Sequence, residues 1–98
     1  MKTVWKYPIR LPFAQRWVKF QMPRGAKILS VQSQLAQTCI WAEVNTDAPL
    51  EDRQFLVVYT GGQAAPDAAR YVGTVLSIND ALVEHVYEVD PNQVLEAN

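Results

Sequence analysis

The sequence predicts an all-β fold, a small antiparallel β-sandwich or partly open barrel of about seven strands with little or no helix. Three observations favour this class. Apolar and polar residues alternate along most of the 98-residue chain, turn-forming residues interrupt this alternation at short intervals, and no long segment has a helical repeat. With 49% apolar and 19% charged residues, the composition is that of one soluble globular domain. We assign this domain to residues 1–90 and treat 91–98 as a C-terminal tail.

The first half of the chain predicts four strands, at residues 4–7, 18–22, 26–34 and 39–44. The first fits an edge strand because Pro8, which cannot donate a ladder hydrogen bond, follows it. The second alternates strictly and stops at Pro23-Arg24-Gly25, a turn sequence. The third and fourth flank the polar interruption 36–38 and are expected to form a hairpin.

The second half predicts three strands, at residues 54–60, 70–77 and 81–89. The run from Phe55 to Tyr59 is the longest apolar stretch and is expected to be a central strand buried on both faces. A loop over 61–67 follows, with a possible helical turn from Pro66 to Arg70. Asn79-Asp80 predicts a second hairpin turn, and Asp90 resembles the cap of a short C-terminal helix.

The two halves of the chain carry opposite charge. Residues 1–42 contain seven lysines and arginines and no acidic residue, a net charge of +7, whereas residues 43–98 contain all ten acidic residues and two arginines, a net charge of −8. This asymmetry favours pairing of basic strands with acidic strands inside the domain. The alternatives are an anionic ligand and a self-complementary homo-oligomer, whose association salt would weaken.

The chain offers few groups for catalysis or metal binding. Cys39 and His85 are its only cysteine and histidine, so it can form neither an internal disulfide nor a Cys/His zinc site. A Cys39–His85 nucleophile–base pair is disfavoured because a free cysteine in a strand is usually a small buried hydrophobe. His85 is expected to be a partly buried, hydrogen-bonded residue beside Tyr87. We therefore expect a non-catalytic protein with no cofactor and no metal.

Other polar residues also have structural interpretations. Glu84, Glu88 and Asp90 alternate on one face of the last strand, which is typical of a solvated face. Thr60-Gly61-Gly62 resembles a phosphate-holding turn, but no Lys-Ser/Thr pair follows as in a P-loop, and a turn needing a positive φ is the alternative.

Arginines and aromatic residues suggest a site for a small anion. Arg53 and Arg70 are the only cations in the acidic half, and both are expected at strand ends. A guanidinium fork for phosphate and an aromatic face for a base would together hold a nucleotide. In the competing interpretation, each arginine pairs with a nearby acid, Asp52 or Asp67, on the surface. The candidate ligand-binding residues are Lys6, Trp41, Arg53, Thr60, Gly61, Arg70 and Tyr71.

Long nucleic acids and membranes are not expected partners. The isoelectric point of about 5.7 is opposite to that of most nucleic-acid-binding domains. The start of the chain lacks the apolar core of a signal peptide, and no apolar run approaches the about 20 residues needed to span a bilayer.

Several segments together carry a family resemblance. They are Trp5-Lys6-Tyr7-Pro8, Met22–Gln32, Cys39–Val44, Asp47-Ala48-Pro49, Arg53-Gln54-Phe55, Thr60-Gly61, Tyr71–Thr74 and Leu82–Glu88. Residues 3 to 88 resemble a widespread family of small phage- and prophage-encoded proteins that carries only a domain-of-unknown-function label. Members often have Gly-Thr-Gly-His where this chain has Tyr59-Thr60-Gly61-Gly62, and many lack the tail after Glu88.

The resemblance implies a viral or prophage accessory protein that acts in the host cytoplasm. We expect a counter-defence protein that sequesters a nucleotide immune signal of the host as a homo-oligomeric sponge. The alternatives are a virion-associated or structural accessory protein and an inhibitor that binds a host protein directly. A hydrolase of the signal is disfavoured because the chain has no clustered acids beside its single histidine and cysteine.

Overall fold

A computed structural model describes residues 1–10, 16–77 and 81–90 of the chain, and these residues form seven strands and no helix. The expected all-β fold is confirmed, and each predicted strand is present. The strands are β1 (Lys2–Pro8), β2 (Trp17–Pro23), β3 (Lys27–Gln34), β4 (Gln37–Asn45), β5 (Leu50–Tyr59), β6 (Arg70–Ser77) and β7 (Leu82–Val89).

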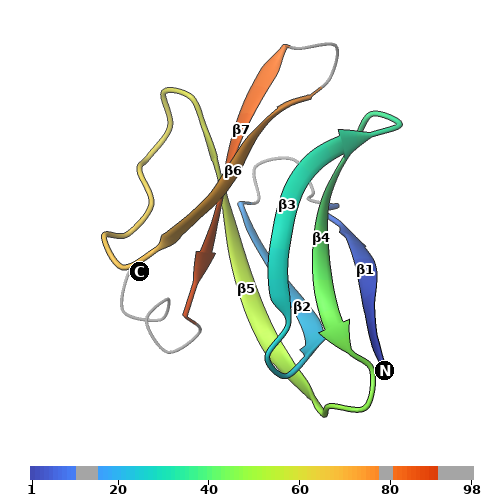
Figure 1. The fold of residues 1–98 in the computed structure, drawn as a ribbon. Coiled ribbons are helices and arrows are strands. Elements are labelled where there is room, and N and C mark those ends of the chain that lie inside the picture. The colour runs from blue at the N-terminus through green and yellow to red at the C-terminus, as the bar shows by residue number, and fades with distance from the viewer. Residues whose placement is uncertain (11–15, 78–80, 91–98) are drawn as a thin grey trace.

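The strands form two antiparallel sheets that are not closed into a barrel. Sheet A has the order β1-β4-β3 and sheet B the order β2-β5-β7-β6. Figure 1 shows the two sheets facing each other, with β1 at the free margin of sheet A. Two open sheets leave four edge strands, namely β1, β3, β2 and β6.

The main core lies between the sheets. Ile40, Ala42 and Val44 of β4 face Phe55 and Val57 of β5, and all five side chains are buried. Aromatic rings extend this core toward β1 and β2: the ring centroids of Tyr7 and Phe20 are 5.3 Å apart, and those of Phe20 and Phe55 are 6.0 Å apart. Alternate residues of each strand therefore point into the space between the sheets, as the alternation in the sequence predicts.

A smaller cluster lies on the outer face of sheet B. Leu56 and Val58 of β5 are buried there beneath Ala65 and Ala69 of the loop that joins β5 to β6. Because Phe55 and Val57 face sheet A, β5 is covered on both faces, which confirms its prediction as the central buried strand. Arg16 anchors the loop by donating a hydrogen bond from Nη2 to the carbonyl of Gln63, 2.7 Å away.

Turn chemistry agrees with the sequence at one turn and differs at another. Gly25 has a φ of 82° in the predicted turn, where the amide of Ala26 donates to the carbonyl of Pro23. The β3–β4 hairpin instead turns at Leu35 and Ala36, whose φ angles are 50° and 63°, not at 36–38 as predicted. A two-residue turn with both φ angles positive usually contains Asn or Gly. Leu35 and Ala36 therefore do not predict this turn.

Where the sequence predicted a possible helical turn from Pro66 to Arg70, the structure has one hydrogen-bonded turn, in which the amide of Ala69 donates to the carbonyl of Pro66. The predicted turn at Asn79-Asp80, the helix start after Asp90 and the tail 91–98 lie outside the described residues.

The two sheets approach each other closely where Gly73 of β6 faces Val31 of β3. A Cβ atom built on Gly73 would lie 2.6 Å from Cγ1 of Val31, closer than two carbon atoms can pack. The pairing of β6 with β7 also shifts by one residue between Tyr71 and Gly73, a β-bulge that re-aims the side chains before it. The glycine and the bulge together fix where the N-terminal end of β6 lies.

Basic and acidic residues from the two halves of the chain meet inside the domain. Lys19 of β2 lies 3.7 Å from Asp52 of β5, and Arg24 lies 3.8 Å from Glu51. These pairs fit the interpretation that the charge split serves strand pairing. For these residues, pairing within the domain explains the charge asymmetry, and no partner molecule is required.

Candidate functional site

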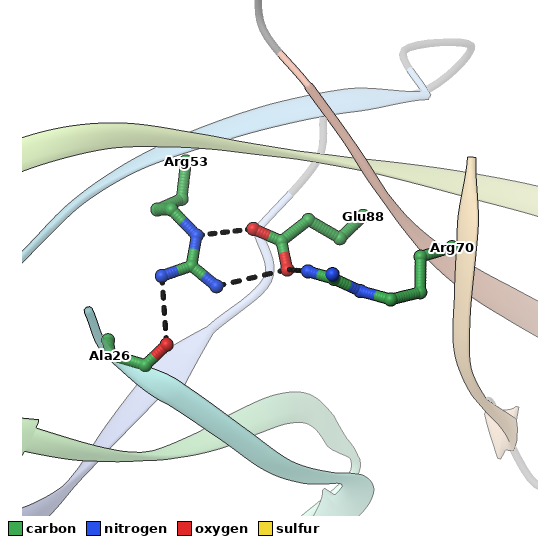
Figure 2. Close-up of polar contacts among 4 residues, drawn as sticks. All are labelled: Ala26, Arg53, Arg70 and Glu88. Carbon is green, nitrogen blue, oxygen red and sulfur yellow. Dashed lines mark hydrogen bonds and ion pairs between the residues drawn. The ribbon is translucent and has the colours of Figure 1, made fainter. Parts of the chain in front are cut away.

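The most polar place between the sheets is a cluster of Arg53, Glu88 and Arg70, which we call the arginine–glutamate cluster. Arg53 lies on β5, Glu88 on β7 and Arg70 at the first position of β6. Figure 2 shows both guanidinium groups converging on the carboxylate of Glu88. The register of sheet B explains this meeting, because Glu88 is opposite Phe55 on β5 and opposite Arg70 on β6.

Arg53 makes a two-pronged contact with the carboxylate. Its Nε donates to Oε2 of Glu88, and its Nη2 donates to Oε1 at 3.0 Å. Its Nη1 donates to the carbonyl of Ala26 at 2.9 Å, which ties sheet B to the start of β3. Arg70 adds a bond from Nη2 to Oε1 of Glu88 at 2.7 Å. Bidentate contacts of this kind are among the strongest hydrogen-bonded ion pairs.

The charges of the cluster stabilise Glu88 in its ionised form. Burial by itself would raise the pKa of Glu88, but the hydrogen bonds and charges of Arg53 and Arg70 outweigh it and hold this pKa below its ordinary value. The hydrogen bond to Glu88 likewise raises the pKa of Arg53. Two guanidinium groups and one carboxylate leave the cluster with a net charge of +1.

The two arginines differ in exposure. The Arg53 side chain is 14% exposed, whereas that of Arg70 is 72% exposed. Arg53 therefore serves the packing of the two sheets, and Arg70 presents most of its guanidinium to solvent. A guanidinium has five N–H donors in a fixed plane, so Arg70 retains donors after its bond to Glu88.

These positions correct three expectations. Arg53 lies inside β5 and not at a strand end. Glu88, not Asp52 or Asp67, is the acid that both arginines contact. The face of Glu84 and Glu88 is the inner face of sheet B and not a solvated face: Glu88 is buried, and Glu84 accepts a hydrogen bond from the hydroxyl of Thr38 in sheet A, 2.8 Å away.

A second polar group lies on the outer face of sheet B, and we call it the hydroxyl–histidine strip. It consists of Thr60, His85, Thr74 and Tyr71. Nε2 of His85 is 2.9 Å from the hydroxyl of Thr60, and Nδ1 is 3.0 Å from the hydroxyl of Thr74, which in turn contacts the hydroxyl of Tyr71. His85 is half-buried with both ring nitrogens hydrogen-bonded, in agreement with its expected structural role.

Aromatic rings border this strip. Tyr71 is 57% exposed, and its ring meets that of Tyr87 edge-on with centroids 5.6 Å apart. Beside Thr60, Gly61 has a φ of 87°, and the amide of Gly62 donates to the carbonyl of Tyr59 at 2.8 Å. The Thr60-Gly61-Gly62 segment is thus a turn that requires glycine, as its structural interpretation predicted.

The structure brings some of the candidate ligand residues together and separates others. Thr60 and Tyr71 belong to the strip, and Gly61 follows Thr60, whereas Arg70, next to Tyr71 along the chain, contacts Glu88 on the inner face of sheet B. Arg53 is enclosed between the sheets. Lys6 and Trp41 are opposite each other on β1 and β4, on the outer face of sheet A, where Nζ of Lys6 donates to Gln34 at 2.8 Å.

Comparison with known proteins gives one match. A family described as a domain of unknown function, DUF7352, matches residues 1–96. The chain belongs to the DUF7352 family. Searches of curated proteins and of solved structures found no match. The DUF7352 match agrees with the expected uncharacterised family and extends through most of the segment 91–98 that we treated as a tail.

The described part of this DUF7352 protein contains no group of three or more His, Cys, Asp or Glu residues placed to hold a metal ion. Among the same residues, no helix is long and apolar enough to cross a membrane. Cys39 lies buried in sheet A and His85 on the outer face of sheet B, so the pair weighed as nucleophile and base does not meet.

Sequence reasoning missed two members of these groups in this DUF7352 chain. The alternation of Glu88 with Glu84 and Asp90 predicts a solvated face, because nothing in this pattern indicates that Glu88 is buried. Thr74 had no signal at all. The hairpin register would have brought both to notice, since it places Thr74 opposite His85 and Arg70 opposite Glu88.

Proposed function

We propose that this protein is a non-catalytic binding protein that holds an anionic nucleotide at the N-terminal end of β6. We also propose that it is a phage or prophage accessory protein that acts in the host cytoplasm. In this role it forms a homo-oligomer and sequesters a nucleotide immune signal. The phage context comes from the resemblance of the sequence. The ligand class comes from the chemistry around Arg70.

The observation that carries the proposal is the exposed guanidinium of Arg70 next to the exposed ring of Tyr71 in sequence. The arginine–glutamate cluster has one positive charge in excess, which favours an anion at the donors that Arg70 still presents. Tyr71 and Tyr87 offer aromatic faces for a base, and the hydroxyls of the strip offer partners for a ribose. β6 is an edge strand of sheet B. A ligand that lies across this edge can therefore contact side chains on both faces of the strand.

A thermal-shift panel of cyclic di- and trinucleotides tests the ligand. We expect the unfolding temperature of the wild type to rise with at least one nucleotide, and we expect Arg70→Ala and Tyr71→Ala to remove that rise. Arg24→Ala is the matched control, because the Arg24 side chain is also 72% exposed and also faces one acid. If no nucleotide shifts the wild type, or if Arg24→Ala removes the shift as Arg70→Ala does, the proposed site is wrong.

Native mass spectrometry of protein purified from cells provides a second readout. We expect an oligomer mass that includes a retained nucleotide, lost in Arg70→Ala. A ligand-free mass from a host carrying an active nucleotide-signalling defence would contradict the sequestration role.

A direct inhibitor of a host protein is the second candidate. Large apolar residues are exposed on several strands and turns, including Leu29, Leu35 and Leu50, and a partner protein that covered them would remove apolar surface from water. A wild type that binds no nucleotide and co-purifies with one host protein, with that capture lost in Leu35→Ser, would favour this function.

A further inference from the structure

We infer that the free edge of β1 pairs with β1 of a second copy, so that two sheets A join into one six-stranded sheet. Within the described residues β1 pairs only with β4, and Figure 1 shows it at the outer margin of sheet A. An edge strand presents unpaired backbone donors and acceptors, which a strand from another chain can satisfy. The strand that pairs with this edge is β1 of the second copy.

β1 is the edge strand best suited to such pairing. Its register with β4 runs without interruption from Lys2 to Pro8, whereas β3 and β6 carry bulges that disturb a straight edge. Val4 and Trp5, adjacent in the middle of β1, are 51% and 40% exposed. No large apolar residue of β2, the remaining edge, is comparably exposed.

Trp5 lies on an unusual side for an exposed residue. It is opposite Ala42 in the register, just as Tyr7 is opposite Ile40, so it shares the face of sheet A that turns toward sheet B. Tyr7 packs against the main core, but Trp5 is not among the residues packed there. A second Trp5 directly across a two-fold axis would cover part of its exposed ring.

Charge selects one register for the antiparallel pair. When Trp5 faces Trp5 of the second copy, Lys2 faces Pro8 and Val4 faces Lys6, so no two lysines are opposite each other. A shift of the axis by one residue toward the N-terminus sets Lys2 against Lys6 in both halves of the pair. A shift by one residue toward the C-terminus sets Lys6 against Lys6, and like charges directly opposite are destabilising.

A two-fold axis that lies midway between two residues is disfavoured for another reason. It would continue the inner face of one sheet A into the outer face of the other, because side chains alternate with a period of two. Among the registers centred within one residue of the middle of β1, only the one centred on Trp5 keeps the apolar side chains of both copies on the same side and the lysines apart. The partner that fits this edge is therefore a second copy of this chain.

This interface differs in its salt response from association between oppositely charged halves. Each β1 brings Lys2 and Lys6, and the pair holds no acid of β1 to balance them. Salt screens repulsion between exposed charges over a Debye length of about 8 Å at physiological ionic strength. We therefore expect added salt to preserve or strengthen this dimer, whereas it would weaken an interface built on opposite charges.

Light scattering on the full chain over a concentration series, at low and high salt, tests the pairing. We expect a concentration-dependent dimer that salt does not dissociate. Val4→Lys, which puts a lysine opposite Lys6 in both halves of the pair, should raise the dissociation constant at least tenfold at low salt. Val4→Glu, the matched variant, puts a carboxylate there and should keep or tighten the dimer.

The two variants also separate pairing from folding. Val4 is opposite Glu43 within the chain, so lysine at this position should suit the folded monomer better than glutamate. A mere folding defect would order the variants in the reverse direction. A monomer at all concentrations, equal masses for the two variants, or a dimer of Val4→Lys stronger than that of Val4→Glu would overturn the inference.

A cross-link fixes the register. Directly opposite residues of an antiparallel pair have Cα atoms about 4.5–5.5 Å apart, within the about 4.4–6.8 Å that a disulfide spans. Trp5→Cys should therefore yield a covalent dimer on mild oxidation. Val4→Cys should not, because the two copies of residue 4 are diagonal neighbours about 7–8 Å apart. The native Cys39 is buried and does not compete.

A cross-link through position 4 in preference to position 5 would contradict this register. The inference supplies an interface for the homo-oligomer of the proposed function and rests on that function for nothing else. A dimer without a nucleotide shift contradicts the nucleotide binding of the proposed function alone. A monomer with a nucleotide shift contradicts this inference and the homo-oligomer, but leaves the nucleotide binding standing.

Discussion

The two faces of β5 are both buried, but they are covered in different ways. Phe55 and Val57 face a whole sheet, whose strands hold one another in register. Leu56 and Val58, which alternate with them, lie beneath small side chains of the loop between β5 and β6. Equal burial therefore does not mean equal resistance to opening, since a loop with few anchors can move away while the sheets stay packed.

The arginine–glutamate cluster repeats this contrast on a smaller scale. Arg53 and Arg70 share one carboxylate, yet the first is enclosed between the sheets and the second is mostly in solvent. The contact with Glu88 therefore has a structural role for Arg53, whereas Arg70 makes the same kind of contact and keeps part of its guanidinium available for binding.

The largest effect is expected from a charge in the inner face of β5. Val57→Asp would bury an unpaired carboxylate in the main core, a cost of several kcal/mol, and should unfold the protein. Val58→Asp places the same group under the loop and should leave a folded but destabilised protein. Circular dichroism and urea unfolding measure both. A soluble Val57→Asp variant with an unchanged spectrum would show that the inner face is not the core.

The next largest effect separates the two arginines. Arg53→Ala leaves the buried carboxylate of Glu88 with only the exposed Arg70, and should lower the free energy of unfolding by about 3 kcal/mol, the low end for breaking a buried ion pair. Arg70→Ala should cost about 0–1 kcal/mol, as for exposed pairs. Urea unfolding that gives equal losses would refute the contrast.

The same carboxylate predicts an acid-sensitive component of stability. The pKa of Glu88 is lower in the folded chain than its ordinary value of about 4.3. Its contribution is therefore fully present above that ordinary value and is lost as the pH falls through the folded pKa. Urea unfolding from neutral pH to strong acid should show this loss in the wild type. Glu88→Gln should be less stable at neutral pH and should lack this part of the acid dependence; an unchanged profile would contradict it.

The most local effect is expected at the loop anchor. Arg16→Ala removes the hydrogen bonds from Arg16 to the carbonyls of Val57 and Gln63, and should cost about 1 kcal/mol. Hydrogen exchange should rise in residues 61–69 while the amides of β5 and β7 keep their protection. A uniform rise across sheet B would mean that the loop and the sheets open together, and the comparison between the two faces of β5 would fail.

The strands and the central position of β5 could be predicted from the sequence. These features are local: alternation, β-branched content and turn residues act over a few positions and appear directly in the order of residues. Even the two-sided burial of β5 follows from an unbroken apolar run. The turn at Leu35 and Ala36 is the local feature that escaped, because its residues are not those that usually adopt positive φ.

Which polar residues meet could not be predicted in this way, because it depends on how the strands pair and pack. If the β6–β7 pairing continued unshifted from Ser77 opposite Leu82, Arg70 would face Val89; the bulge between Tyr71 and Gly73 moves it opposite Glu88 instead. The approach of Gly73 to Val31 of the other sheet accompanies this shift, and no pattern within β6 announces it. Whether a charged residue is buried depends on register and on contacts between residues far apart in the chain, and alternation along a strand carries no information about either.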